Sequence, residues 1–125
     1  MFLLEGPVMR YALDECGRNT SVFHRRTGHE YMEIPGDVFK LIYSVPGTER
    51  VESVIWQQDQ DLEITQNGNE ILLRCGPLTG QEGRMIDAEM RMHFTMDGEG
   101  LRVTAELENR DPSVILVHSS SFFQS

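Results

Sequence analysis

The sequence predicts an all-β fold, an antiparallel β-sandwich of about nine short strands, and three observations support this. Apolar and polar residues alternate over long stretches, most regularly between residues 86 and 108, which is the period of a strand with one buried face. Turn signals with Gly, Asn or Pro recur about every 8–15 residues, a spacing typical of sandwiches and barrels. No stretch combines a helical period with capping residues.

The clearest element is an antiparallel hairpin over residues 85–109. In each of its two strands one parity is apolar and the other is polar, and "DGEG" at 97–100 supplies the turn between them. The polar parity of the first strand carries Glu89 and His93, which should face solvent. The residues expected to face the core are Ile86, Ala88, Met90, Met92, Phe94 and Met96, then Leu101, Val103, Ala105 and Leu107.

Shorter strands are expected on either side of this hairpin. "VMRYALDE" and "TSVFHRR" flank Gly17, "DVFKLIYSV" and "VESVIWQQ" flank Pro46-Gly47, and "LEIT" and "EILLRC" flank "QNGN". In the last of these turns, Asn67-Gly68 is the preferred pair for a type I′ hairpin. The C-terminal "VILVHSSSFFQS" carries Phe122 and Phe123, which predict either a last strand that pairs with something or a domain cut short, with an open sheet edge left to a partner.

The length and charge limit the function. The 125 residues fit one domain, residues 1–125, and leave open whether the chain is a fragment of a longer protein. The formal net charge is −9, from 20 acidic against 11 basic residues. Such a field repels phosphates, so neither nucleic acid nor a membrane surface is expected as a partner, and neutral ligands such as sugars remain.

The chain shows neither a targeting segment nor a metal-binding pattern. The N-terminus lacks a signal peptide, and no segment approaches the ~20 apolar residues of a membrane span, so a cytoplasmic location is expected. Cys16 and Cys75 have no metal-ligand spacing; two free thiols are expected there, with one disulfide as the alternative. The four histidines also lack common ligand spacings, so neither a metal nor another cofactor is expected.

Three residues are candidates for contact with carbohydrate: Trp56, Glu89 and His93. Trp56 is the only tryptophan, and an exposed indole would stack on the apolar face of a sugar; the alternative is a place in the core beside Val54 and Ile55. Glu89 and His93 are the residue types that could act as acid and base on a sugar. No nucleophile motif or phosphate loop is present, so no catalytic residue is assigned.

The stretch "FHRRTGHEYM", residues 23–32, gathers two histidines, a glutamate and a tyrosine around Thr27-Gly28. The histidines, His24 and His29, are five residues apart, which suits neither strand nor helix ligand pairs. The stretch therefore predicts a turn in which Gly28 takes a positive φ, rather than a metal site.

The order of motifs over residues 8–110 is a further observation. It runs from "MRYALDE" through a Gly turn and "TSVFHRR" into "TGHEYM", then through a Pro-Gly break to "DVFKLIYSV", with Gln58-Asp59-Gln60 and "LENRD" further on. This order resembles the amino-terminal β-sandwich of bacterial glycoside-hydrolase-like proteins, a domain of the galactose-mutarotase-like supersandwich type. In those proteins the sandwich packs on a catalytic (β/α) barrel, which 125 residues cannot include, so the resemblance implies a stand-alone fragment or an excised domain. The chain would also have about half the length of a complete supersandwich.

The resemblance implies a non-catalytic accessory domain of a carbohydrate-active enzyme, with the barrel as its packing partner and carbohydrate as a ligand. Two alternatives stay open. One is a mutarotase-like or epimerase-like enzyme that uses His93 and Glu89 on a sugar. The other is a structural module that forms a homodimer through an open edge strand.

Overall fold

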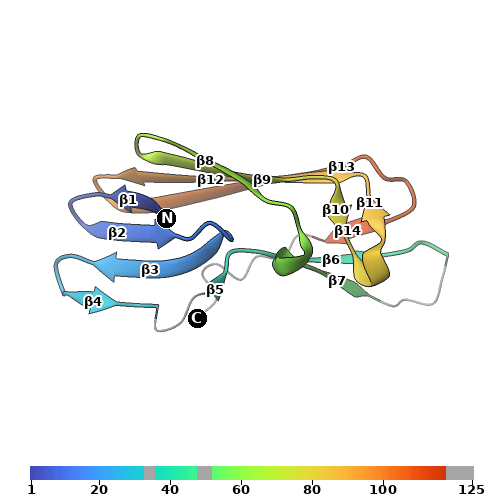
Figure 1. Ribbon diagram of the computed structural model, residues 1–125, viewed down its shortest axis with the longest axis horizontal. Helices are drawn as coiled ribbons and strands as arrows, with labels where there is room; N and C mark the ends of the chain where they lie inside the picture. The colour runs from blue at the N-terminus through green and yellow to red at the C-terminus, as the bar shows by residue number, and fades with distance from the viewer. Residues whose placement is uncertain (33–35, 48–51, 118–125) are drawn as a thin grey trace.

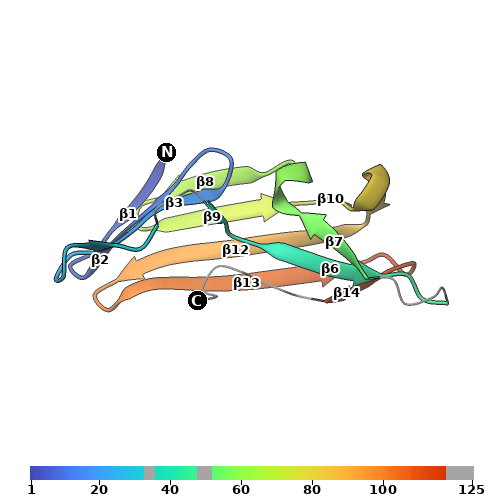
Figure 2. The ribbon, with the colours of Figure 1, turned by 90° about the horizontal axis from the view of Figure 1, so that it is seen from below.

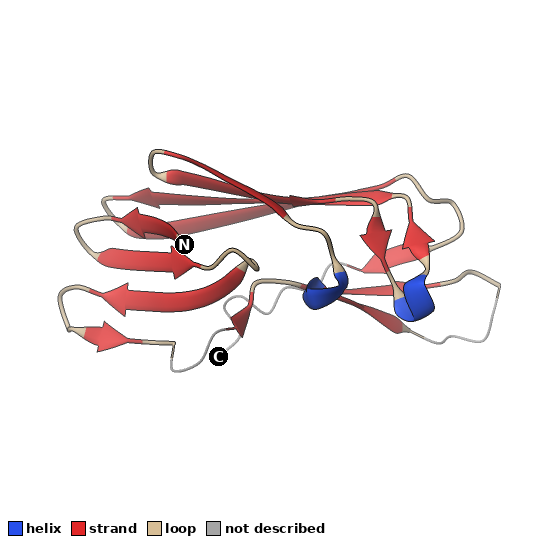
Figure 3. Cartoon of the chain, in the orientation of Figure 1, coloured by secondary structure: helices blue, strands red, loops and turns tan. Residues whose placement is uncertain are grey.

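The computed structural model describes residues 1–32, 36–47 and 52–117 and confirms the predicted all-β class. In this part of the chain the helical segments are two single-turn 3₁₀ helices, η1 (Gln57–Asp59) and η2 (Gln81–Gly83) (Figure 3). The strands are β1 (Phe2–Glu5), β2 (Met9–Leu13), β3 (Arg18–His24), β4 (His29–Glu30), β5 (Gly36–Asp37), β6 (Lys40–Ser44), β7 (Ser53–Trp56), β8 (Glu63–Asn67), β9 (Glu70–Cys75), β10 (Leu78–Thr79), β11 (Met85–Ile86), β12 (Ala88–Asp97), β13 (Gly100–Asn109) and β14 (Ile115–Val117).

The strands form three larger sheets and one short pair, with antiparallel pairing throughout the described residues. The sheets have the orders β13-β12-β9-β8, β14-β6-β7 and β1-β2-β3-β4, with β5 also paired to β3, and β10 pairs with β11. Figure 1 shows the β13-β12-β9-β8 sheet running along the length of the molecule. The other two larger sheets lie on the same side of it, with β1–β4 towards one end and β6, β7 and β14 towards the opposite end. Figure 2 shows β6, β7 and β14 lying across β12 and β13.

The predicted hairpin is present over residues 88–109, where β12 and β13 pair over ten consecutive residues from Ala88↔Asn109 to Asp97↔Gly100. Residues 85 and 86 of the predicted first strand form β11 instead, which pairs with β10. All six residues predicted to face the core in its first strand are buried. In β13 the burial is incomplete, because Leu101, Val103 and Leu107 are half-buried and Ala105 is exposed. The difference arises because β13 is the end strand of its sheet. It has a neighbouring strand at one edge only, so its inward-facing side chains are less completely covered than those of β12.

The core lies between the four-stranded sheet and the two sheets that face it. Tyr11 of β2 stacks on Phe94 of β12, with ring centroids 5.6 Å apart. The Tyr11 hydroxyl donates a hydrogen bond to Asn19 Oδ1, so this buried phenol and buried amide satisfy each other. Burial raises the pKa of Tyr11, and the nearby Asp14 carboxylate adds to the effect. Further core members are Leu4, Leu13, Leu41, Tyr43, Ile55, Ile71, Leu73, Met90 and Met92.

The hairpin turn at residues 66–69 differs from the predicted type I′ turn. Asn67 pairs with Glu70, so the two loop residues are Gly68 and Asn69 rather than Asn67 and Gly68. Gly68 has a φ of +60°, whereas Asn69 is not among the described residues with positive φ. Positive φ at the first loop position alone is the pattern of a type II′ turn.

Residues 37–45, predicted as one strand, are interrupted before β6. Val38 and Phe39 are buried but lie outside any strand, and their N–H groups donate to Oε1 of Gln57 at 2.8 and 3.2 Å. Gln57 Nε2 donates in turn to the carbonyl oxygens of Gly17 and Cys16 at 2.6 and 3.2 Å. The side-chain amide of Gln57 thus takes the place of a neighbouring strand and links three segments.

Other differences concern short elements and the chain end. The sequence pattern missed β1, which has four residues, and β10, which has two, since such short strands carry little or no detectable period. The predicted open edge at Phe122 and Phe123 lies outside the described residues. Cys16 is exposed, Cys75 is buried, and both are free thiols as predicted; burial raises the pKa of Cys75 to about 12.

The role of Gln57 leads to a test of stability. We expect Gln57→Leu to lower the free energy of unfolding by about 3 kcal/mol or more, because each buried backbone group left without a partner costs about 1–3 kcal/mol. Urea denaturation followed by circular dichroism measures this. Gln58→Leu at the exposed neighbouring position is the control and should change stability by less than about 0.5 kcal/mol. Equal stability of the two variants would contradict the linking role.

Candidate functional site

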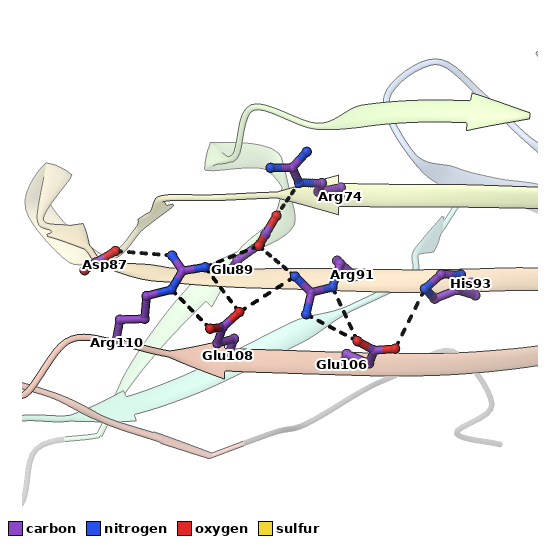
Figure 4. Close-up of polar contacts among 8 residues, drawn as sticks. All are labelled: Arg74, Asp87, Glu89, Arg91, His93, Glu106, Glu108 and Arg110. Carbon is purple, nitrogen blue, oxygen red and sulfur yellow. Dashed lines mark hydrogen bonds and ion pairs between the residues drawn. The ribbon is translucent and has the colours of Figure 1, made fainter.

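The outer face of the β13-β12-β9-β8 sheet carries two of the three predicted site residues and is called the polar face here. It alternates with the buried face of the same strands, so its side chains come from every second residue. Figure 4 shows its charged residues reaching across β9, β12 and β13. The members used below are Glu70 and Arg74 of β9, Glu89, Arg91 and His93 of β12, and Glu106 and Glu108 of β13, with Asp87 and Arg110 just beyond the strand ends.

Glu89 lies at the centre of an ion-pair network on the polar face. Its Oε1 accepts a hydrogen bond from Nε of Arg74, and its Oε2 accepts one from Nη1 of Arg91 at 2.7 Å. Nη2 of Arg110 is 3.5 Å from the same Oε2 (Figure 4). The residue is only 8% exposed. The hydrogen bond from Arg74 is the main cause that lowers the pKa of Glu89, and the charges of the three guanidinium groups act in the same direction.

The network continues on β13. Nη2 of Arg91 is 3.2 Å from Oε2 of Glu106, and its Nη1 is 3.8 Å from Glu108. Arg110 contacts Glu108 at 3.2 Å and Asp87 at 3.7 Å. The contacts of Arg91 with Glu106 and Glu108, and of Arg110 with Asp87, join β12 and its flanking residue to β13 and its flanking residue on the solvent side. Opposite charges at such cross-strand positions stabilise a sheet by roughly 0.2–1 kcal/mol for each pair.

His93 lies between two glutamates at the far side of this network. Its Nδ1 is 3.4 Å from Oε1 of Glu70, and its Nε2 is 3.9 Å from Oε1 of Glu106. The His93 side chain is 32% exposed, so water reaches the imidazole. The strand registers set this position. Towards β9, His93 pairs with Leu72 and Thr95 pairs with Glu70. Towards β13, His93 pairs with Thr104.

The predicted shared face of Glu89 and His93 is confirmed, but their contacts do not suit a catalytic pair. Arg91 lies between them in sequence and on the same face, and it contacts Glu89 directly. The lowered pKa of Glu89 keeps its carboxylate ionised, which does not suit a general acid at neutral pH and makes it a weaker general base. Both of its oxygens also accept hydrogen bonds already, from Arg74 and Arg91. The geometry therefore makes Glu89 the acceptor of a structural ion-pair network.

Two hollows lie near polar groups. One, of about 220 Å³, is lined at the end of the polar face by Arg74, Pro77, Glu89 and Arg110 among others. A second, of about 440 Å³, lies beside η1 and includes Cys16, Arg18, Asp37 and Gln57 in its lining. Sequence patterns missed this second hollow, because its residues come from segments far apart in the chain. The polar groups of Gln57 in its wall are already bonded to the backbone.

Trp56 lies on a different sheet, β14-β6-β7, and is 42% exposed, so the alternative of a core position is wrong. Its neighbour Ile55 is fully buried, and alternation along β7 then turns Trp56 outward. Trp56 is paired with Lys40, Val54 with Ile42, and Ile115 with Ser44. Directly paired residues share one face of a sheet. This outer surface is called the Trp56 face and consists of Lys40, Ile42, Ser44, Val54, Trp56 and Ile115.

The stretch at residues 23–32 forms the predicted turn. Gly28 has a φ of +69° and its N–H donates to the His24 carbonyl at 2.9 Å. The Nδ1 of His24 accepts a hydrogen bond from the Thr27 N–H at 3.3 Å. Glu30 accepts hydrogen bonds from the Ser21 hydroxyl and the Val22 N–H, which fasten β4 to β3. The polar groups of this stretch therefore serve local structure.

Comparison with known proteins adds no assignment, since no family model and no curated protein matches the sequence. Within residues 1–32, 36–47 and 52–117, no group of three His, Cys, Asp or Glu side chains is placed to hold a metal ion. The described part of the chain also has no helix with the length and apolar character required to cross a membrane.

The Glu89 network gives a prediction of pH dependence. The pKa of Glu89 is lower in the folded than in the unfolded chain, so its stabilisation is present above the unfolded value of about 4.3 and is lost as the pH falls through the folded value. Glu89→Gln should be less stable than the wild type at neutral pH, and the two should converge as the pH falls below about 4.

Urea denaturation at a series of pH values measures this difference. Glu99→Gln is the control, because Glu99 lies in the β12–β13 turn and its side chain makes no ion pair with the described residues. Its difference from the wild type should stay small at every pH. Curves for Glu89→Gln and the wild type that ran parallel down to about pH 2 would show that the ion pairs do not couple to folding.

Proposed function

We propose that the protein is a non-catalytic accessory β-sandwich of a carbohydrate-active enzyme and that it contacts carbohydrate through the Trp56 face. The observation that carries the proposal is the exposure of Trp56, the only tryptophan of the chain, on the outer face of the β14-β6-β7 sheet. A large aromatic ring exposed to water at this level, beside other apolar side chains, is typical of a surface that binds something.

The chemistry of the Trp56 face suits a neutral sugar. The indole and the neighbouring Ile42, Val54 and Ile115 offer apolar area to the C–H face of a sugar ring. Lys40, paired with Trp56, and Ser44 offer polar groups to the sugar hydroxyls. A net charge of −9 does not repel such a ligand, whereas it opposes the approach of phosphates.

The non-catalytic part of the proposal is supported by the polar face. The carboxylate and the imidazole that a mutarotase-like or epimerase-like reaction would use, Glu89 and His93, are each engaged with other charged side chains. A resemblance of motifs supports the assignment to a carbohydrate-active enzyme. The motifs, above all "RTGHEY" at residues 26–31, resemble those of the sandwich of glycoside-hydrolase-like proteins.

Trp56 also provides the test, because its fluorescence reports on this one position. We expect titration with a panel of oligosaccharides to change the emission of Trp56 for at least one of them. Trp56→Ala should then weaken binding of that sugar, measured by calorimetry, by about tenfold or more, since it removes the stacking area of one aromatic ring. Each tenfold loss corresponds to about 1.4 kcal/mol.

Tyr31→Ala is a matched control, because Tyr31 is also an exposed aromatic residue, at 60%, but lies outside the β14-β6-β7 sheet. It should leave sugar binding unchanged. If no sugar of the panel alters the emission or binds in calorimetry, or if Trp56→Ala and Tyr31→Ala bind equally well, the proposed carbohydrate contact is wrong.

A further inference from the structure

The outer edge of β13 is the longest open strand edge in the described part of the chain. β13 is the end strand of its sheet, and no described strand pairs with its second side. Its ten residues pair with β12 without a register shift, so the strand is regular along its whole length. Natural edge strands are often protected from further pairing by a proline, a bulge or charged side chains, lysine above all. "GLRVTAELEN" contains no Pro, Lys or bulge, and its charged residues are Arg102, Glu106 and Glu108.

The backbone groups at this edge can be assigned from the register. Arg110 N–H donates to the Asp87 carbonyl at 2.9 Å, and in an antiparallel ladder every second residue of the strand bonds to the same neighbour. The even-numbered residues of β13 therefore bond to β12. The N–H and C=O groups of Leu101, Val103, Ala105 and Leu107 consequently point away from β12, towards the open edge.

The side chains along β13 are complementary to those of the same strand running in the opposite direction. When a second β13 is paired about Ala105, Arg102 lies opposite Glu108 and Val103 opposite Leu107. When it is paired about Thr104, Arg102 lies opposite Glu106. Both registers pair the outward-pointing backbone groups with each other. A register about Glu106 would instead place Glu106 opposite its own copy, and Arg102 opposite Arg110, which is repulsive.

We propose that two copies of this chain associate through antiparallel pairing of β13 with β13, in one of the two registers centred on Thr104 or on Ala105. The pairing joins the two four-stranded sheets into one continuous sheet across the dimer axis. It places the half-buried Val103 and Leu107 and the exposed Ala105 against the partner, on the inner face that the monomer leaves incompletely covered. On the outer face it sets the guanidinium of Arg102, whose side chain is 70% exposed, beside a glutamate of the second copy.

The first test is sedimentation velocity at about 0.15 M salt, where screening limits the repulsion between two chains of charge −9. The wild type should shift from monomer to dimer as the concentration rises. Arg102→Glu places like charges opposite each other twice and should weaken the dimer about tenfold. Arg26→Glu, an exposed residue of the β3–β4 turn, changes the net charge equally and should dimerise as the wild type does.

A second variant tests the strand edge itself. Ala105→Pro removes only an outward-pointing N–H, and proline is tolerated in an edge strand at such a position. Its circular dichroism should match the wild type while dimerisation is lost.

Cysteine variants test the centre of the pairing. In a Cys16→Ser background, either Ala105→Cys or Thr104→Cys should form a disulfide-linked dimer on oxidation, since opposed residues at the axis have Cα atoms within disulfide range. Met85→Cys, an exposed site on β11 outside the β13 edge, is the control and should stay uncrosslinked.

A wild type that stays monomeric over the whole concentration series would overturn the proposal. So would a folded Ala105→Pro variant that dimerises normally, or the absence of crosslinking at both Thr104→Cys and Ala105→Cys. These outcomes are independent of sugar binding, because β13 contributes no residue to the Trp56 face.

Discussion

The strict alternation of β12 is the constraint on which the rest of the structure depends. Its even-numbered residues fill the core between the sheets, and its odd-numbered residues build the ion pairs of the polar face. The strand pairs with β9 on one side and β13 on the other, so its register fixes theirs as well. A shift by one residue would turn Glu89, Arg91 and His93 into the core, so burial of the apolar set fixes which parity of β12 faces inward.

This division of labour explains where a ligand could be accommodated. The charged groups of the polar face largely satisfy one another, with Glu89 shared by three guanidinium groups, so an incoming ligand would have to displace ion pairs. The Trp56 face is different, because it exposes the indole of Trp56 and the aliphatic side chain of Ile115 to water. The open edge of β13 is a third surface, defined by backbone groups rather than by side-chain chemistry.

Much of the fold follows from local pattern, because a period of two is visible wherever a strand has one wet and one dry face. The β12–β13 hairpin and the outward position of Glu89 and His93 were predictable for that reason. The Gln57 contacts were not, since they join Gly17, Val38 and Phe39 across up to 40 positions of sequence. The partners of Glu89 come from β9, β12 and the segment after β13, so the change from candidate acid to ion-pair centre also required three-dimensional neighbours.

We propose that the polar face is structural and that ligand contact belongs to the Trp56 face. Backbone amide NMR spectra recorded during titration with an oligosaccharide compare the two faces in one experiment. We expect the shift changes to be confined to β6, β7 and β14, around Lys40, Ile42 and Trp56. Changes centred on Glu89, Arg91 and His93, with β6 and β7 unaffected, would contradict this proposal.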